Sequence, residues 1–354
     1  MDTCLPLREL DDVICTMPLG FFHYRLLLMS GMGFMADAME VSLLSYLSVC
    51  AGAEWDLKEA EIASITSVVF VGELLGSLFW GPMADKYGRR KSYIGAILFI
   101  SVGGFLSAIS PNLATLLFLR FIVGFGVGGL SVPFDLLAEF LPSGNRGRFL
   151  MYIELFWTAG SLSVAGMAWA VLSDHGWRAL AFITAIPVTL ACFLSILYLP
   201  ESARWHLENG RTLQAEVLVK AAAVVNRSEL KPFTLSPHIS AHTSPRSTSQ
   251  SGGPEDLPAL LPATEISSFL STFIDLFNPK QWRISLALFV VWGAFGFAYY
   301  GVILFVSRIF SHVSSTGCSF QYSSVFINAS FEVVGVLFVA MIIDPFGRTR
   351  SQAV

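Results

Sequence analysis

Eight long apolar runs, separated by polar segments, are the main feature of the chain. They cover residues 24–48, 62–84, 92–110, 113–137, 149–172, 178–198, 284–309 and 322–343. About 20 residues of α-helix, at roughly 1.5 Å each, cross the ~30 Å hydrocarbon core of a bilayer. The pattern therefore predicts an all-α membrane protein that spans the bilayer eight times.

The composition supports this class of protein. The chain is 54% hydrophobic and 14% charged, whereas a soluble globular chain is about a quarter charged. A soluble protein with one large helical core does not account for so many long runs. The lipid bilayer is thus the first expected partner, and we expect no nucleic-acid partner.

Basic residues alternate between the two sides of the predicted spans. The turn after the second run holds Lys86, Arg89, Arg90 and Lys91, whereas residues 110–112 and 310–321 on the other side hold no basic residue. Lysine and arginine are enriched on the cytoplasmic side of membrane proteins. The alternation predicts that the N-terminus, residues 199–283 and the C-terminus are cytoplasmic.

A polar segment divides the chain into two parts. Residues 226–258 are rich in Ser, Thr, Pro and His, which is typical of a flexible linker. The predicted domains are a six-helix half over 1–225, a linker over 226–263 and a two-helix part over 264–354. The flanking residues 201–225 and 264–278 are amphipathic, and we expect short cytoplasmic helices there.

The two parts are related by an internal repeat. Residues 72–90 align without a gap with residues 331–349 at seven identical positions, which include the pairs Glu73 and Glu332, and Arg89 and Arg348. Repeats whose halves are parallel are a known plan of secondary transporters.

Several motifs resemble one superfamily. The turn Gly81-Pro-Met-Ala-Asp85-Lys-Tyr-Gly88-Arg89-Arg90-Lys91 and the segment Pro200-Glu-Ser-Ala-Arg-Trp205 are similar to the major facilitator superfamily. Residues 36–40, 138–142 and 299–301 resemble its synaptic-vesicle-protein-related branch, near the sugar porters and organic ion transporters. The resemblance implies a bundle of twelve helices in two halves. This chain ends after the eighth, so we expect a C-terminally truncated form, most simply from a shortened gene model or splice form.

The basic turns predict a cytoplasmic gate. Gly81 and Gly88 would allow close helix approach and a tight turn, and Asp85 could pair with Arg89. The resemblance implies a latch between the halves, and the alternative is that these residues only anchor the helices. The candidate gate residues are Gly81, Asp85, Gly88, Arg89, Arg90, Glu139, Arg146, Glu201, Arg204, Asp344 and Arg348.

Charged residues also occur deep inside the apolar runs. Asp37 and Glu40 share one face of the first helix, and counting residues places Arg120 of the fourth helix at the depth of Glu40. Ionisable groups at that depth are costly and usually pair or serve an ion path. We expect a cluster of Asp37 and Glu40 with Arg120, which could bind a proton or a charged substrate group. A fixed structural pair is the alternative.

Other candidates lie near this cluster. Glu73, where the resembled branch has a neutral residue, either favours cationic substrates or reaches a neighbouring helix as a neutral acid. Tyr299 and Tyr300 are candidate cavity aromatics, and Glu154 and Asp135 are expected at the gate. Gly124 to Gly129 fits GxGxxG inside an apolar helix, which indicates helix packing, because a dinucleotide site needs a preceding strand.

The sequence predicts a transporter and not an enzyme. No metal-ligand spacing, HExxH or GxSxG motif is present, so we expect no metal or cofactor. Cys50 and Cys318 could both reach the outer side, which leaves a disulfide open. The expected function is ion- or proton-coupled secondary transport of a small organic solute by alternating access, in the plasma membrane or a vesicle membrane. The alternative is a non-transporting receptor-like or vesicle protein, or an inactive truncated form.

Overall fold

The computed structural model describes residues 7–142, 146–228, 232–235, 277–278, 281–314 and 317–346. The described residues belong to two separate units, residues 1–239 with 304–354, and residues 240–303. Most of the linker and residues 264–276, where we expected a short helix, lie outside the described residues.

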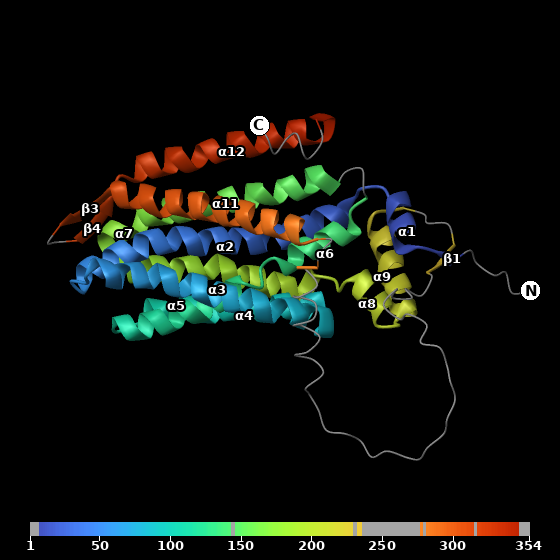
Figure 1. Cartoon of the computed structure of the whole chain (residues 1–354), viewed down its shortest axis with the longest axis horizontal. Helices are drawn as coiled ribbons and strands as arrows, with labels where there is room; N and C mark the ends of the chain where they lie inside the picture. Colours follow the sequence, from blue (N-terminus) through green and yellow to red (C-terminus); the bar gives the residue numbers. More distant parts are fainter. Residues whose placement is uncertain are drawn as a thin grey trace, which may run out of the picture. The chain divides into compact units, whose positions relative to one another are not determined.

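Long helices make up most of the described chain (Figure 1). The elements are β1 (Leu7–Arg8), α1 (Leu10–Thr16), α2 (Phe21–Glu54), α3 (Glu59–Tyr87), α4 (Arg89–Ala108), α5 (Leu113–Val127), α6 (Val132–Phe140), α7 (Arg146–Tyr198), α8 (Ala203–Glu208), α9 (Thr212–Val225), β2 (Thr234–Leu235), α11 (Trp282–Ile309), β3 (Ser311–Ser314), β4 (Gly317–Phe320) and α12 (Tyr322–Phe346).

The eight predicted spans are present. Among the described residues, seven continuous stretches are long and apolar enough to cross a membrane, and the 53-residue α7 holds two of the spans. Its two parts meet at Gly176, which has a φ of 76° that glycine adopts without strain. The fourth span consists of α5 and α6, and Pro133 lies in the first turn of α6. The chain is therefore a multi-pass membrane protein.

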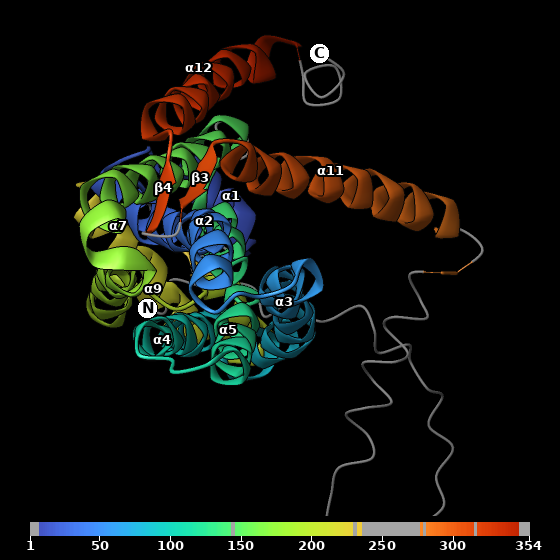
Figure 2. The same cartoon turned by 90° about the vertical axis from the view of Figure 1, so that its left-hand side faces the viewer.

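The two ends of the bundle differ in structure. One end, here called the hairpin end, holds the β3–β4 hairpin and the α2–α3 turn, while the other, the basic end, holds α1, α8, α9 and the turn at Arg89 (Figures 1 and 2). The sequence predicted α8 and α9 as helical. The strands were not predicted: β3 and β4 form an antiparallel hairpin, and β1 pairs with β2 in parallel.

Helices α3 and α5 pack with their backbones in contact. A Cβ at Gly76 would collide with the Phe125 carbonyl, and one at Gly124 would collide with the Val69 carbonyl. Small residues allow such close approach in membranes, where packing rather than the hydrophobic effect holds helices together. The GxGxxG match is thus a helix-packing motif, as expected.

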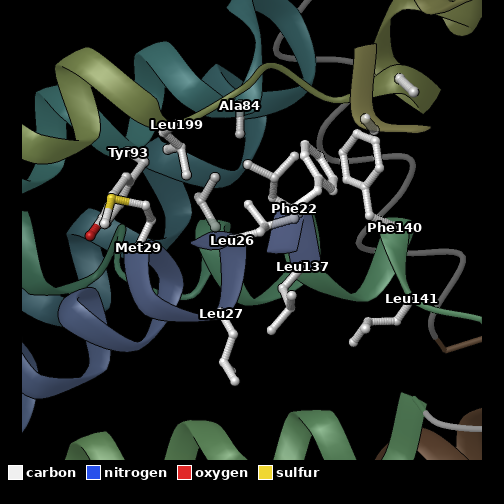
Figure 3. Packing of buried hydrophobic residues seen from close by; sticks show 14 of the residues in the cluster. Phe22, Leu26, Leu27, Met29, Ala84, Tyr93, Leu137, Phe140, Leu141 and Leu199 are labelled. Atoms are coloured by element: carbon white, nitrogen blue, oxygen red, sulfur yellow. The ribbon is translucent and has the colours of Figure 1, made fainter. Parts of the chain in front are cut away.

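An apolar cluster fills the basic end. It joins α1, α2, α4, α6, α7, α8, α9 and β2, and Figure 3 shows part of it around Phe22, Leu26, Leu137 and Phe140. The Phe22 and Phe140 rings meet edge to face with centroids 5.2 Å apart. This packing holds the ends of α2 and α6 against the short helices and so positions the charged residues of the basic end.

Candidate functional site

The central feature of the bundle is a buried ion pair between α2 and α5. Nη1 of Arg120 lies 2.9 Å from Oε2 of Glu40. Arg120 is 0% exposed and Glu40 is 4% exposed. A second contact fixes the guanidinium, because Nε of Arg120 donates to Oγ of Ser107 on α4 at 3.1 Å. The predicted meeting of Arg120 and Glu40 is confirmed.

Ser107 completes this arrangement and was not predicted. Its hydroxyl donates to the Gly103 carbonyl at 2.7 Å and accepts from Arg120. A buried charge is tolerated when it is paired and its remaining protons find acceptors. Nη2 of Arg120 is buried and makes no hydrogen bond within the described structure. Nη2 of Arg120 can therefore donate a hydrogen bond to a further acceptor.

Asp37 does not join this pair as we expected. It lies one turn from Glu40 toward the basic end, near the middle of α2, and its Oδ1 is buried with no hydrogen-bond partner in the described structure. The groups that interact with it electrostatically are the carboxylates of Glu73, Glu40 and Glu154. Glu40 therefore holds Arg120, while Asp37 faces other acids.

The acids around Asp37 come from separate helices. Glu73 lies near the middle of α3, Glu154 lies on α7, and Glu154 interacts in turn with Glu332 of α12. We call Asp37, Glu40, Glu73, Glu154 and Glu332 the acidic group. Glu154 interacts electrostatically with Asp37 and Glu332, and its role at the gate stays a prediction. Like charges at low dielectric repel strongly, so the group suits protons or a positively charged ligand.

Tyr299 and Tyr300 lie on α11, in the other unit. Their rings meet edge to face with centroids 5.8 Å apart, and Tyr299 stacks on Phe295. Their role as cavity aromatics remains a prediction.

A second charged cluster lies at the basic end. Arg89, at the start of α4, pairs with Glu139 at 3.1 Å and with Asp135 at 3.5 Å, both on α6. Glu139 also accepts a hydrogen bond from the Ser202 hydroxyl. The expected pairing of Asp85 with Arg89 was wrong: Arg89 begins a new helix after the turn and points to α6. The backbone carbonyl of Asp85 instead accepts from Nε1 of Trp205 at 2.7 Å.

Glu201 links the same cluster to the segment after α7. Its Oε1 accepts from the backbone N–H of Arg90 at 3.1 Å and of Ser202 at 3.0 Å. Gly88 has a φ of 107°, and a Cβ there would collide with the Glu201 carboxylate. The tight turn predicted at Gly88 is therefore present. Arg90 itself donates to the Ile196 carbonyl at 2.6 Å.

Three predicted gate residues lie outside the cluster around Arg89 and Glu139. An added Cβ at Gly81 would have no atom of the described residues within 4 Å, so its predicted role in close helix approach was wrong for this part of the chain. Arg146 donates to the Leu141 carbonyl, and Arg204 pairs with Asp11 of α1 at 3.0 Å. The side chain of Asp344 and all of Arg348 lie outside the described residues, so the latch between the halves remains a prediction.

Comparisons with known proteins agree with this architecture. The family model for the sugar (and other) transporter family matches residues 19–352. The organic cation/carnitine transporter 7 of Arabidopsis thaliana is 32% identical over 97% of this chain and 72% of its own length. The synaptic vesicle 2-related protein of Xenopus laevis is 30% identical over 97% of this chain. The chain spans 61% of that protein's length.

A solved structure has the same fold. The xylose transporter XylE from E. coli, in a partially occluded inward open conformation, matches with a TM-score of 0.51 and 22% identity, over 58% of this chain and 56% of its own. The bundle thus has the fold of a known multi-pass transporter. The chain belongs to the sugar (and other) transporter family of the major facilitator superfamily, in the branch that the sequence motifs predicted.

Proposed function

We propose that this chain acts in secondary active transport: it moves a small organic solute through the bilayer by alternating access, coupled to protons. The observation that carries the proposal is the buried Glu40–Arg120 pair beside Asp37. A fixed structural pair would not need a second carboxylate one turn away, with a buried oxygen that makes no hydrogen bond to the described residues.

The acidic group supports proton coupling. The charged groups that interact with Asp37 are the carboxylates of Glu73, Glu40 and Glu154. Burial of several like charges is expensive unless they are neutralised. A proton on Asp37 would lower that repulsion, and its release would restore it. A carboxylate left by a departing proton would also present an acceptor to Nη2 of Arg120, one turn away.

The same acids support a solute that carries a positive charge. Asp37 interacts electrostatically with the carboxylates of Glu40, Glu73 and Glu154, which come from three helices. The relatives named above include an organic cation/carnitine transporter, and the matched structure is a xylose transporter. We propose an organic cation as the preferred solute and a neutral polyol or sugar as the competing class.

The basic end of the bundle would then serve as a gate. The ion pairs of Arg89 with α6 are partly exposed, and exposed pairs are weak enough to break and re-form during a cycle. We propose that they form part of a gate at the basic end. The excess of Lys and Arg supports a cytoplasmic basic end, with the protein in the plasma membrane or in a vesicle membrane.

Uptake into proteoliposomes tests this function. Purified chain is reconstituted and offered a labelled organic cation, a labelled sugar and a labelled organic acid, each with and without a proton gradient. We expect uptake of the cation above protein-free vesicles, stimulated by the gradient and abolished by an uncoupler. Binding without uptake for every solute would favour the receptor-like alternative.

A further inference from the structure

The hairpin end holds a covalent link between the two parts of the chain. Cys50, in the last turns of α2, forms a disulfide with Cys318 of β4, with the Cα atoms 5.4 Å apart. The two residues are separated by 268 positions in the sequence. The bond therefore ties the hairpin between α11 and α12 to the first membrane span.

Non-covalent contacts surround this bond. The ring of Phe320 meets Tyr46 edge to face at 4.8 Å, and Tyr322 stacks on Trp169 of α7. Phe320 is buried in an apolar cluster with α2, α3, α5 and α7. Arg308 pairs with Glu59 at the start of α3. The hairpin thus packs against α2 and α7, and the adjoining residues Arg308 and Tyr322 contact α3 and α7.

The basic end shows a different arrangement. Within the described residues, the apolar cluster of that end contains no residue beyond Leu235. The apolar cluster of the hairpin end, in contrast, includes Cys318, Phe320, Tyr322 and Val325. Within the described residues, the hairpin therefore packs at the end that alternating access would have to open to the outside.

We propose that the Cys50–Cys318 disulfide is a redox-controlled lock on the hairpin end. When the bond is formed, the hairpin stays fixed to α2 and this end stays closed. When the bond is reduced, the hairpin is held by non-covalent contacts, namely the apolar cluster around Phe320, the ring contacts and the exposed Arg308–Glu59 ion pair, and such contacts can break and re-form within a transport cycle. The inference rests on the proposed function, since a lock matters only if the hairpin end opens.

The chemistry of the lock is thiol–disulfide exchange. One thiolate of a small dithiol attacks one sulfur of the disulfide and forms a mixed disulfide, and the second thiolate closes the reagent's own ring. Two electrons pass from the dithiol to the protein, two protons go to Cys50 and Cys318, and the reagent leaves as its cyclic disulfide. The predicted outer location of this end is one where disulfides persist.

The test measures access to Asp37 from the hairpin side. The chain is placed in sealed vesicles and treated with a charged, membrane-impermeant carbodiimide and an amine, before and after a dithiol. Mass spectrometry locates the modified carboxylates. Exposed Glu61 near the hairpin end reports delivery of the reagent, and exposed Glu208 at the basic end reports vesicles of the opposite orientation.

We expect modification of Asp37 to rise at least about tenfold on reduction, while modification of Glu61 stays constant. The double variant Cys50→Ser/Cys318→Ser should show the high level without reductant. Equal modification of Asp37 with the disulfide oxidised and reduced would overturn the proposal of a lock. Loss of the fold on reduction would also overturn it, and is detected when the buried thiol of Cys192 becomes reactive.

This measurement is independent of the proposed function, because it does not require solute uptake. A redox-dependent change in Asp37 access without any transport would support the lock and contradict the transporter. Uptake that is unaffected by reductant, with constant access to Asp37, would support the transporter and contradict the lock.

Discussion

Arg120 and Glu40 form a buried ion pair in the bundle, with 2.9 Å between Nη1 and Oε2, although 80 positions separate them in the sequence. Taking both charges out of water is costly, and their attraction repays this cost only with good geometry and further hydrogen bonds. Ser107 supplies one such bond. The pair therefore depends on α2, α4 and α5 together.

The first prediction follows from this dependence. Glu40→Gln should lower stability by about 3–5 kcal/mol, because it leaves the Arg120 charge buried without its partner. Asp37→Asn should cost far less, since Asp37 does not share the guanidinium. The double variant Glu40→Gln/Arg120→Gln should recover most of the loss. Thermal unfolding in detergent measures all three, and a double variant no more stable than Glu40→Gln would exclude a direct interaction.

The second prediction concerns the gate. Arg89→Ala removes the contacts with Glu139 and Asp135, so it should slow the conformational cycle and leave solute affinity nearly unchanged. Arg211→Ala is the matched control at the same end: the Arg211 guanidinium lies over the Trp205 ring, 5.2 Å from its centroid, and acts on His206, and among the described residues it forms no ion pair with α6. Uptake kinetics and equilibrium binding separate the two effects. A loss confined to affinity would remove Arg89 from the gate.

The third prediction uses two glycines of α3. Gly76→Ala should destabilise the chain by about 1–3 kcal/mol, because its Cβ would collide with the Phe125 carbonyl and overpacking of a tight contact is costly. Gly81→Ala should be neutral or slightly stabilising, because that side is open and alanine favours a helix. Equal melting temperatures for the two variants would show that α3 and α5 do not pack through their backbones.

The fourth prediction concerns His206 of α8. Burial lowers the pKa of His206 below its usual value, the Glu201 carboxylate opposes this effect, and Arg211 adds to it. The unfolded chain, with a histidine pKa near about 6.5, then binds more protons than the folded chain. Stability should therefore fall as pH drops below about 6.5, and above that pH His206 should add no further pH dependence. His206→Gln should reduce the slope of stability against pH below about 6.5. An unchanged slope would mean that other groups cause the pH dependence.

The apolar pattern was sufficient to predict the eight spans, because span length depends only on bilayer thickness and helix rise. The Glu40–Arg120 pair could be predicted from depth along two helices. The partner of Arg89 could not be predicted in this way, because the direction of a side chain after a turn depends on tertiary packing. The prediction of close helix approach at Gly81 was wrong for the same reason. The sequence shows that the residue is small, but it does not show which helix faces it.

The hairpin and its disulfide were the largest features that the sequence did not predict. Residues 311–320 are short, polar and rich in Ser, so no alternating apolar pattern distinguishes them from a loop. Nothing in the sequence brings Cys318 near Cys50 except their common side of the membrane. Ser107 likewise cannot be distinguished from other helical serines until α4 and α5 are placed together.

The central claim is that Asp37, held beside the Glu40–Arg120 pair, couples a proton to solute movement. The most direct measurement is the pH dependence of solute uptake in proteoliposomes by the unaltered chain, by Asp37→Asn and by the exposed control Glu208→Gln. We predict that the unaltered chain and Glu208→Gln share a steep pH profile, and that Asp37→Asn gives a flat one while remaining folded. An Asp37→Asn variant with an unchanged rate and an unchanged pH profile would contradict the account.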